Sequence, residues 1–273
     1  MLNLLKDRYI NTSLGTFKIS VRPGDTLLVF LKGYGPYDTA QIFQPIIQKI
    51  PKEIGVLAID YLDSGLSSSS TKPFLLTDEA DLITRIIKNQ HASKIVIIAH
   101  SLGGFYALPI AQKLNQLIGF IGIEPITKEV LLDPPDEANY NRDAKEDSEM
   151  TEDEITNLMH ERIYTSFQKT LADKIWNTAL ISEEKDAKIT KPHGLNLGID
   201  ILKRPDFSNL SLDQTVSTTL FVRPYRINEY SHSEYYTEKT TIVPLGKNHY
   251  IHFEFPEKIS EAILKILKEN NNT

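Results

Sequence analysis

Residues 94–108 read KIVIIAHSLGGFYAL, a short apolar run that meets a histidine and a serine and then continues with small and apolar residues. The first six residues are almost continuously apolar and rich in β-branched side chains, a pattern typical of a parallel strand buried on both faces. From Leu102 onward the apolar residues follow at helical spacing. Ser101 is therefore predicted to lie at a sharp turn from a strand into a helix, the geometry of a nucleophile elbow.

The residues around Ser101 have the sizes that such a turn requires. At the apex of a tight strand-to-helix turn, the residues two before and two after the serine are pressed together, so only small side chains fit. Ala99 and Gly103 satisfy this condition, and Gly104 allows the new helix to lie close to the sheet. The same turn directs the first amides of the helix, beginning with Leu102, toward the group that the serine attacks.

Length, charge and cysteine content limit the classes of protein to which the chain can belong. Its 273 residues are enough for one large α/β domain with an insertion. A net charge of -6 argues against nucleic acid or an anionic membrane as a partner. Without cysteine there is no disulfide, thiolate metal site or cysteine nucleophile. The apolar start of the chain is too short for a signal peptide or membrane anchor, so we expect a cytoplasmic protein acting on a small molecule. The oligomeric state stays unknown.

Strands and helices alternate along the rest of the chain. Buried strands are predicted at 26–31, 54–59, 117–123, 218–223 and 240–244, after an N-terminal hairpin of strands at 9–12 and 16–21. Amphipathic helices are predicted at 39–50, 78–89 and 256–268. This alternation predicts an α/β fold with a mostly parallel sheet and helices on both faces.

The turn at Ser101 resembles the elbow of the α/β-hydrolase superfamily, with AHSLGG following an apolar strand and Ala99 in place of the commoner first glycine. The resemblance extends over nearly the whole chain. It implies the α/β-hydrolase fold and a serine hydrolase of the esterase or proline iminopeptidase-like branch, which needs no metal or cofactor.

The composition changes between the predicted strands at 117–123 and 218–223. Residues 131–161 contain eleven acidic side chains and two basic ones, with no strand periodicity. Thr151 and Glu154 have the spacing of a capping box, which predicts one helix with apolar positions continuing to Ile175. The superfamily inserts its lid at this place, so the resemblance implies a helical cap at 128–212 and a hydrolase core formed by 1–127 and 213–273.

Serine needs a base to remove its proton, usually a histidine oriented by a carboxylate. His249 follows the last predicted strand, and GKNHYIHFEFPE at 246–257 resembles the GxxHxxxxExPE ending of the superfamily. The resemblance implies that His249 is the base, with His252 as the alternative. His100, beside the serine in sequence, is expected to pack beneath the turn.

Two glutamates are candidates for the acid. Most superfamily members have an acid about four residues after the penultimate strand, where Glu229 comes one or two residues late. Another branch has it at the end of the strand after the elbow, and GFIGIEPI at 119–126 resembles that segment of some haloalkane dehalogenases. Its GIEP also resembles the GLDP of pancreatic-type lipases. We therefore favour Glu124 and keep Glu229 as the alternative acid, since both preserve the order nucleophile, acid, histidine.

The oxyanion hole is predicted from the loop after the strand at 26–31. In the superfamily a His-Gly-x loop supplies one oxyanion amide, and here Lys32 stands in place of that histidine before Gly33 and Tyr34. The resemblance implies that the backbone amides of Tyr34 and Leu102 form the oxyanion hole. The alternative interpretation is a glycine-rich turn without a catalytic role.

These residues predict a hydrolase that cleaves a carboxylic ester through an acyl-serine intermediate. One alternative is an aminopeptidase of the proline iminopeptidase type, in which acidic cap residues would bind the ammonium group of the substrate. The other is a ligand-binding homologue without activity. A serine nucleophile argues against dehalogenase and epoxide hydrolase chemistry, for which the superfamily uses aspartate.

Overall fold

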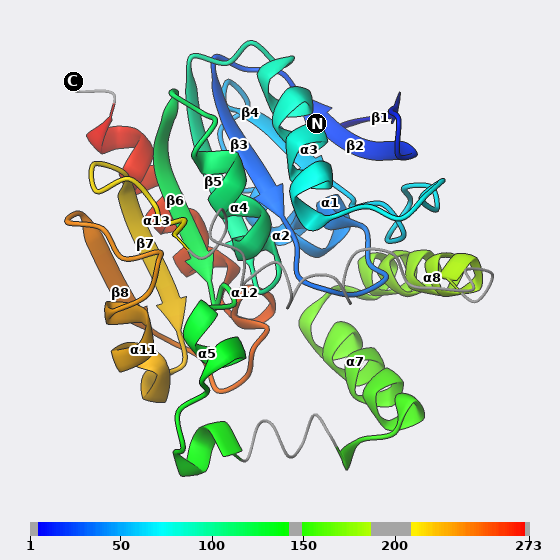
Figure 1. The fold of residues 1–273 in the computed structure, drawn as a ribbon. Helices are drawn as coiled ribbons and strands as arrows, with labels where there is room; N and C mark the ends of the chain where they lie inside the picture. The colour runs from blue at the N-terminus through cyan, green and yellow to red at the C-terminus, as the bar shows by residue number, and fades with distance from the viewer. Residues whose placement is uncertain (1–4, 142–148, 187–208, 271–273) are drawn as a thin grey trace.

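A computed structural model describes residues 5–141, 149–186 and 209–270 (Figure 1). Its centre is an eight-stranded sheet with the strand order β1-β2-β4-β3-β5-β6-β7-β8. The strands are β1 Lys6–Asn11, β2 Thr16–Arg22, β3 Thr26–Leu31, β4 Gly55–Ile59, β5 Lys94–His100, β6 Leu117–Ile123, β7 Ser217–Val222 and β8 Thr240–Pro244. Strand β2 runs antiparallel to both β1 and β4, and all other neighbours are parallel. The predicted mostly parallel sheet is confirmed.

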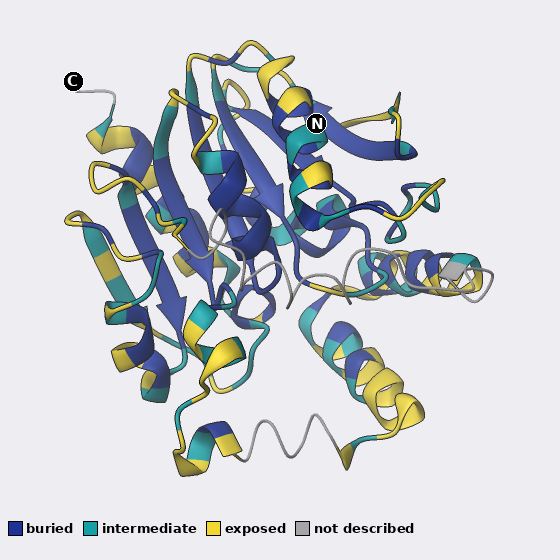
Figure 2. Cartoon of the chain, in the orientation of Figure 1, coloured by how far each residue is buried: buried dark blue, intermediate teal, exposed yellow. Residues whose placement is uncertain are grey.

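The central strands are buried on both faces because successive side chains point to opposite sides of the sheet. In β3, Leu27, Val29 and Leu31 belong to one hydrophobic cluster, whereas Leu28 and Phe30 belong to the cluster on the other face. Figure 2 shows the central strands as a buried layer between helices. Their continuous apolar sequence is explained by this double coverage.

Helices cover both faces of the sheet. They are α1 Thr39–Ile42, α2 Gln44–Ile47, α3 Leu76–Lys88, α4 Gly103–Ala111, α5 Lys128–Leu132, α7 Glu152–Ser166, α8 Lys169–Asp186, α11 Ile227–Ser231, α12 Ile251–Glu254 and α13 Pro256–Glu269, with a 3-10 turn η1 at Pro224–Arg226. Helices α3 and α4 contact each other in front of the sheet, and α2 contacts α13 behind it (Figure 1). This is the three-layer arrangement that the alternating sequence predicted.

The helix predicted over 39–50 is instead two short helices, α1 and α2, separated at Phe43. Pro45 lies in the first turn of α2 and has no N–H, so the hydrogen-bond ladder of α1 cannot continue through it. The Phe43 side chain is buried, with its ring centroid 5.2 Å from that of Phe30. The proline therefore explains the error in the prediction.

The helix predicted from Thr151 to Ile175 is also two helices. Thr151 and Glu154 form the capping box at the start of α7 as predicted, but the helix ends before Phe167. That residue is extended (φ -117°, ψ 151°), and its buried ring meets Phe253 edge to face at 4.8 Å. This contact with a distant residue cannot be seen in the apolar spacing of the segment.

Helices α5, α7 and α8 lie between β6 and β7 in sequence. Figure 1 shows α7 and α8 beyond the ends toward which the parallel strands point. Helix α8 is attached to the loop after β4, because the Lys185 ammonium donates to the carbonyls of Gly65 (2.7 Å) and Ser67 (2.9 Å). The division into a core and a cap remains a prediction. Among the described helices, none combines the length and apolar character needed to cross a lipid bilayer.

Candidate active site

Ser101 lies at the turn between β5 and α4, in a left-handed backbone conformation with φ 50°. Its N–H donates to the carbonyl of Ile123 at 3.2 Å, and its carbonyl accepts from the amides of Gly104 (2.9 Å) and Ile126 (3.0 Å). These bonds join the turn to β6 and to the first turn of α4. They hold the serine in a conformation that L-residues seldom adopt.

The glycines after Ser101 are required by close contacts. A Cβ atom added at Gly103 would lie 2.4 Å from the carbonyl oxygen of Leu31, and one added at Gly104 would lie 2.5 Å from the Cβ of Pro125. No side chain fits at either position without displacing backbone or a neighbouring ring. The close approach of α4 to the sheet, inferred from the sequence, is therefore a steric property of this turn.

The loop after β3 lies directly against the serine. A Cβ atom added at Gly33 would lie 3.0 Å from the Cβ of Ser101 and 2.7 Å from the Nδ1 of His100. In the described part of the chain, neither the amide of Tyr34 nor that of Leu102 donates to any acceptor. Two amides without acceptors, one next to Gly33 and one next to Ser101 in sequence, are what an oxyanion hole offers.

Lys32 supports this loop from inside the protein. Its buried ammonium donates to the carbonyl of Gly35 and to the hydroxyl of Ser64, each at 2.6 Å. The residue that stands where the superfamily usually has histidine thus connects the loop after β3 to the loop after β4.

Glu124 follows β6 and also has a left-handed backbone, with φ 40°. Its side chain is fully buried, and Oε2 lies 2.9 Å from the Nδ1 of His249. The backbone amide of Arg223 donates to Oε1 at 2.8 Å. Because a carboxylate only accepts when ionised, His249 donates through Nδ1 and its Nε2 is left as the acceptor.

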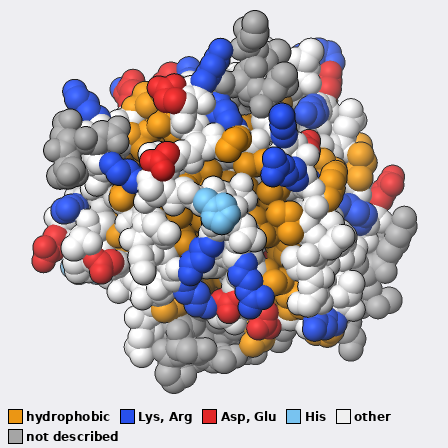
Figure 3. Space-filling model, turned by 90° about the horizontal axis from the view of Figure 1, so that it is seen from above, with side chains coloured by type: hydrophobic (Ala, Val, Ile, Leu, Met, Phe, Trp, Pro, Cys, Tyr) orange, Lys and Arg blue, Asp and Glu red, His pale blue; other side chains and the backbone are white. Residues whose placement is uncertain are grey.

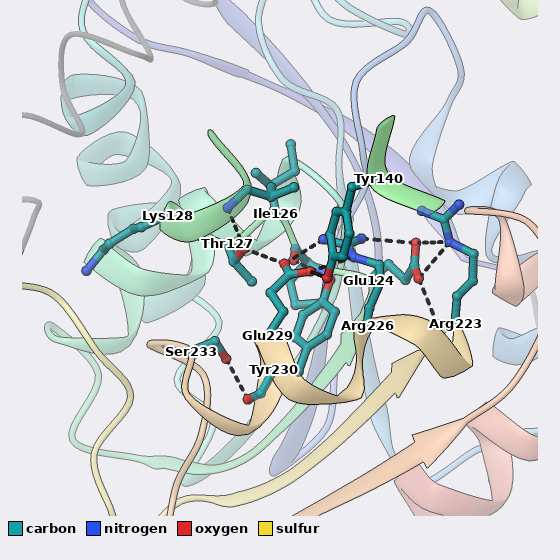
Figure 4. Close-up of polar contacts among 12 residues, drawn as sticks. Glu124, Ile126, Thr127, Lys128, Tyr140, Arg223, Arg226, Glu229, Tyr230 and Ser233 are labelled. Atoms are coloured by element: carbon teal, nitrogen blue, oxygen red, sulfur yellow. Dashed lines mark hydrogen bonds and ion pairs between the residues drawn. The ribbon is translucent and has the colours of Figure 1, made fainter. Parts of the chain in front are cut away.

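Two arginines surround the Glu124 carboxylate (Figure 4). The Nε of Arg223 lies 2.9 and 3.0 Å from the two carboxylate oxygens, and the Nη1 of Arg226 lies 3.2 Å from Oε2. Burial opposes ionisation of Glu124, but the hydrogen bond with His249 and the charges of Arg226 and Arg223 hold the pKa of this carboxyl well below its usual range. Glu124 is therefore an anion at neutral pH.

Glu229, the alternative acid, is buried in a different set of contacts. Arg226 donates to its two oxygens through Nε (2.8 Å) and Nη2 (2.6 Å), and the hydroxyls of Tyr140 (2.7 Å) and Thr127 (2.5 Å) donate as well. These four donors match the four lone-pair sites of a carboxylate. The structure brings Glu124, and not Glu229, to His249.

The three histidines near the turn have different environments. His100 is buried, and burial together with His252 and His249 lowers the pKa of its ring well below the usual value. The neutral ring donates through Nε2 to the backbone carbonyl of His249 at 3.1 Å, so His100 packs beneath the turn and holds the loop after β8. Burial lowers the pKa of His252 to about 3, and its ring stacks on Phe43 at 4.9 Å. Neither ring nitrogen of His252 has a described partner.

A pocket of about 260 Å³ lies beside the His249 loop. Asn248 and Tyr250, on either side of His249, line it together with Arg162 and other residues of α7. The Arg162 guanidinium lies 5.3 Å from the centroid of the Tyr250 ring. Figure 3 shows one face of the molecule on which hydrophobic and basic side chains surround a histidine. In the described ranges no three His, Asp or Glu side chains are grouped as metal ligands would be.

Arg223, Arg226 and Tyr140 were missed in the sequence analysis. The two arginines lie in RPYRINE at 223–229, directly after β7, where parallel strands end beside one another. A buried acid at the end of β6 needs cationic or hydrogen-bonding partners from a neighbouring strand end. The two arginines could therefore have been predicted as partners of Glu124 from the sequence. Tyr140 gave no such signal, because its contacts are with Glu229 and Tyr225, which lie far away in sequence.

Comparison with models of protein families identifies the family of the chain. Residues 28–262 match the model of the Alpha/beta hydrolase family, so the chain belongs to this family. The match includes Ser101, Glu124 and His249 and extends from β3 into α13.

Similar proteins share the fold at low sequence identity. The chain is similar to Smu.1393c of Streptococcus mutans, with 24% identity, a TM-score of 0.85 and coverage of 97% of this chain and 98% of the other. It is also similar to a thioesterase domain from the curacin biosynthetic pathway, with 14% identity, a TM-score of 0.61 and coverage of 95% and 99%. The 2-(acetamidomethylene)succinate hydrolase of Mesorhizobium japonicum is 22% identical over 118 residues, which are 42% of each chain.

Proposed function

We propose that the protein is a serine hydrolase that cleaves a carboxylic ester of a small molecule through an acyl-enzyme at Ser101. The observation that carries this proposal is the 2.9 Å contact between the buried, ionised Glu124 and the Nδ1 of His249. A carboxylate in this position fixes the tautomer in which Nε2 can accept a proton from serine.

In the proposed mechanism, His249 takes the Ser101 proton through Nε2 as the hydroxyl oxygen adds to the ester carbonyl. The amides of Tyr34 and Leu102 hold the oxyanion, each worth about 3 kcal/mol of transition-state stabilisation. Collapse of the tetrahedral intermediate expels the alcohol, which takes the proton from His249, and leaves the acyl-serine. His249 then takes a proton from water as the water oxygen attacks the acyl carbon. When this second tetrahedral intermediate collapses to the acid, His249 returns the proton to the departing Ser101 oxygen.

The acidic residues at the start of α7 bear on the aminopeptidase alternative. Glu152, Asp153 and Glu154 are exposed in the first turn of this helix, where carboxylates interact favourably with the helix dipole. A structural reason for these three charges weakens the case for an ammonium-binding site, on which the aminopeptidase alternative rests. The 2-(acetamidomethylene)succinate hydrolase is by name also a hydrolase, which supports hydrolysis of a small molecule.

The test is labelling with a fluorophosphonate, together with hydrolysis of p-nitrophenyl acetate and butyrate. We expect the wild type to be labelled and active, Ser101→Ala to lose both properties, and Ser260→Ala, a buried serine in α13, to keep both. Proline naphthylamide and naphthyl acetate are compared in the same way. Faster turnover of the amide, or equal turnover by wild type and Ser101→Ala, would contradict the ester proposal.

A further inference from the structure

A chain of polar contacts connects Glu124 to the segment between β6 and β7. The Tyr140 hydroxyl donates to Oε2 of Glu229 at 2.7 Å, and the forked Nε and Nη2 of Arg226 hold both Glu229 oxygens. The remaining nitrogen of that guanidinium, Nη1, reaches Oε2 of Glu124 at 3.2 Å. Figure 4 shows the side chains of Tyr140, Glu229, Arg226 and Glu124 converging in this way.

A second set of contacts also connects Tyr140 to Glu124. The ring of Tyr140 meets that of Tyr225 edge to face, with centroids 5.2 Å apart at 89°. The guanidinium of Arg223 lies 5.1 Å from the centroid of Tyr225 and binds Glu124 through Nε. Tyr140 therefore contacts Glu229, which binds Arg226, and Tyr225, which lies against Arg223. Both of these arginines bind the Glu124 carboxylate.

Arg226 and His249 donate hydrogen bonds to the same carboxylate oxygen of Glu124. Oε2 of Glu124 accepts from Nη1 of Arg226 and from Nδ1 of His249. Nε and Nη2 of Arg226 are both bound to Glu229, so the plane of the guanidinium group is fixed in one orientation. The position of Nη1 then restricts how the Glu124 carboxylate can rotate.

The cluster is closed to solvent and balanced in charge. Tyr140 is 8% exposed, Arg226 5%, Glu229 2% and Glu124 0%. Two carboxylates face the two guanidinium groups of Arg223 and Arg226, and Glu229 has no lone-pair site left for a further donor. Loss of one donor from such a buried network leaves an acceptor unsatisfied and loosens the remaining contacts.

We propose that Arg226, Glu229 and Tyr140 are positioning residues for the base: they hold the Glu124 carboxylate in the orientation that binds His249. This inference rests on the proposed function of Glu124 and His249. Tyr140 belongs to a short helical stretch at 138–141, so the contacts of that stretch with the residues after β7 contribute to the alignment of the base.

The experiment compares Tyr140→Phe and Arg226→Lys with Tyr164→Phe. The matched control removes another tyrosine hydroxyl between β6 and β7, one that donates to Asp173 at 2.8 Å. Two quantities are measured: kcat and KM for p-nitrophenyl butyrate, and the exchange rate with water of the His249 Nδ1 proton by NMR. That proton is assigned through its loss in His249→Gln.

We expect Tyr140→Phe to lower kcat and to speed proton exchange, each roughly three- to tenfold as for the loss of one buried hydrogen bond, with KM unchanged. Arg226→Lys keeps the charge but loses the fork, and we expect at least about a tenfold effect on both. Tyr164→Phe should match the wild type. Wild-type exchange of the His249 proton in Tyr140→Phe would overturn the proposal. Changed exchange without any Ser101-dependent hydrolysis would overturn the proposed function and support the positioning role.

Discussion

Ser101 and Glu124 share a rare backbone conformation. Both have positive φ, 50° and 40°, and they follow the adjacent strands β5 and β6. A left-handed L-residue costs about 1–3 kcal/mol and persists only where the surroundings impose it. The Glu124 amide donates to Phe221 in β7, and the Ser101 amide donates to Ile123 in β6, so the two turns are held by neighbouring strands. Such strain concentrates at functional sites, in agreement with the proposed roles.

Glu79 is a buried carboxyl outside the site. It accepts from the Tyr106 hydroxyl at 2.5 Å and from the Leu62 amide at 2.7 Å. Burial raises the pKa of the Glu79 carboxyl to about 7, against a reference value of 4.5, despite these two hydrogen bonds. Glu79 therefore makes stability depend on pH near neutrality.

We predict that the wild type loses stability as the pH rises through neutrality and that Glu79→Gln does not show this loss. A raised folded-state pKa means that the contribution of Glu79 is fully present below pH 4.5 and is lost as the pH rises toward 7. The difference in unfolding free energy between Glu79→Gln and wild type should therefore grow in favour of the variant by about 3 kcal/mol from pH 4.5 to 8. Urea unfolding across this range measures it, with the exposed Glu238→Gln as control. A difference independent of pH would contradict the prediction.

At the scale of elements, α7 depends on its capping box. The Thr151 hydroxyl accepts from the Glu154 amide at 3.3 Å, while the Glu154 carboxylate accepts from the Thr151 amide at 2.8 Å. Such reciprocal bonds satisfy two helix N–H groups that have no partner inside the helix.

We predict that Thr151→Ala destabilises the start of α7 by about 1 kcal/mol. Hydrogen exchange of the first-turn amides should quicken about fivefold, as expected for an opening free energy lower by that amount. Thr165→Ala, which removes a hydroxyl that bonds back to Glu161 at the other end of the helix, serves as the control. Equal exchange of the first turn in both variants would show that the cap has no role in holding it.

The strands were predictable because their signal is local. Residues 26–31, 117–123 and 240–244 are strands with the predicted bounds, since continuous apolar runs between turn residues have few other uses. The helix breaks at Phe43 and Phe167 were not predicted. The first depends on Pro45, whose effect was overlooked, and the second on a contact with Phe253, far away in sequence.

For the site, the sequence reduced the acid to two glutamates and favoured Glu124, but it did not exclude Glu229. Glu124 and Glu229 both follow strands at the correct edge of the sheet. Only the three-dimensional structure shows that both oxygens of Glu229 accept from Arg226, whereas Oε2 of Glu124 lies against Nδ1 of His249. Sequence spacing contains no information on which of the two buried acids faces the histidine, so the choice required side-chain geometry.

At the scale of the whole molecule, the topology gathers the site. The loop with Tyr34 follows β3, Ser101 follows β5, Glu124 follows β6 and His249 follows β8, all of them parallel strands of one sheet. Because the carboxyl ends of parallel strands meet at one edge, residues more than 200 positions apart in sequence come together there. Helices on both faces bury the strands and leave this edge as the place for chemistry.

The fold alone does not determine the reaction. A thioesterase domain and a Pseudomonas aeruginosa protein described as an epoxide hydrolase both share it, at 14% and 12% identity. The reaction must therefore be argued from the side chains at the strand ends. In this chain those are a serine, a histidine and a glutamate held by two arginines.

The most direct test of this arrangement compares Glu124→Gln with Glu229→Gln in the hydrolysis of p-nitrophenyl butyrate, with thermal unfolding as a check on folding. Replacing the acid that orients the histidine should lower kcat by about 10³- to 10⁴-fold, because the amide favours the wrong tautomer. Glu229→Gln loosens Arg226 and should lower kcat only about tenfold. An equal or larger loss in Glu229→Gln, with both variants folded, would contradict the assignment of Glu124 as the acid.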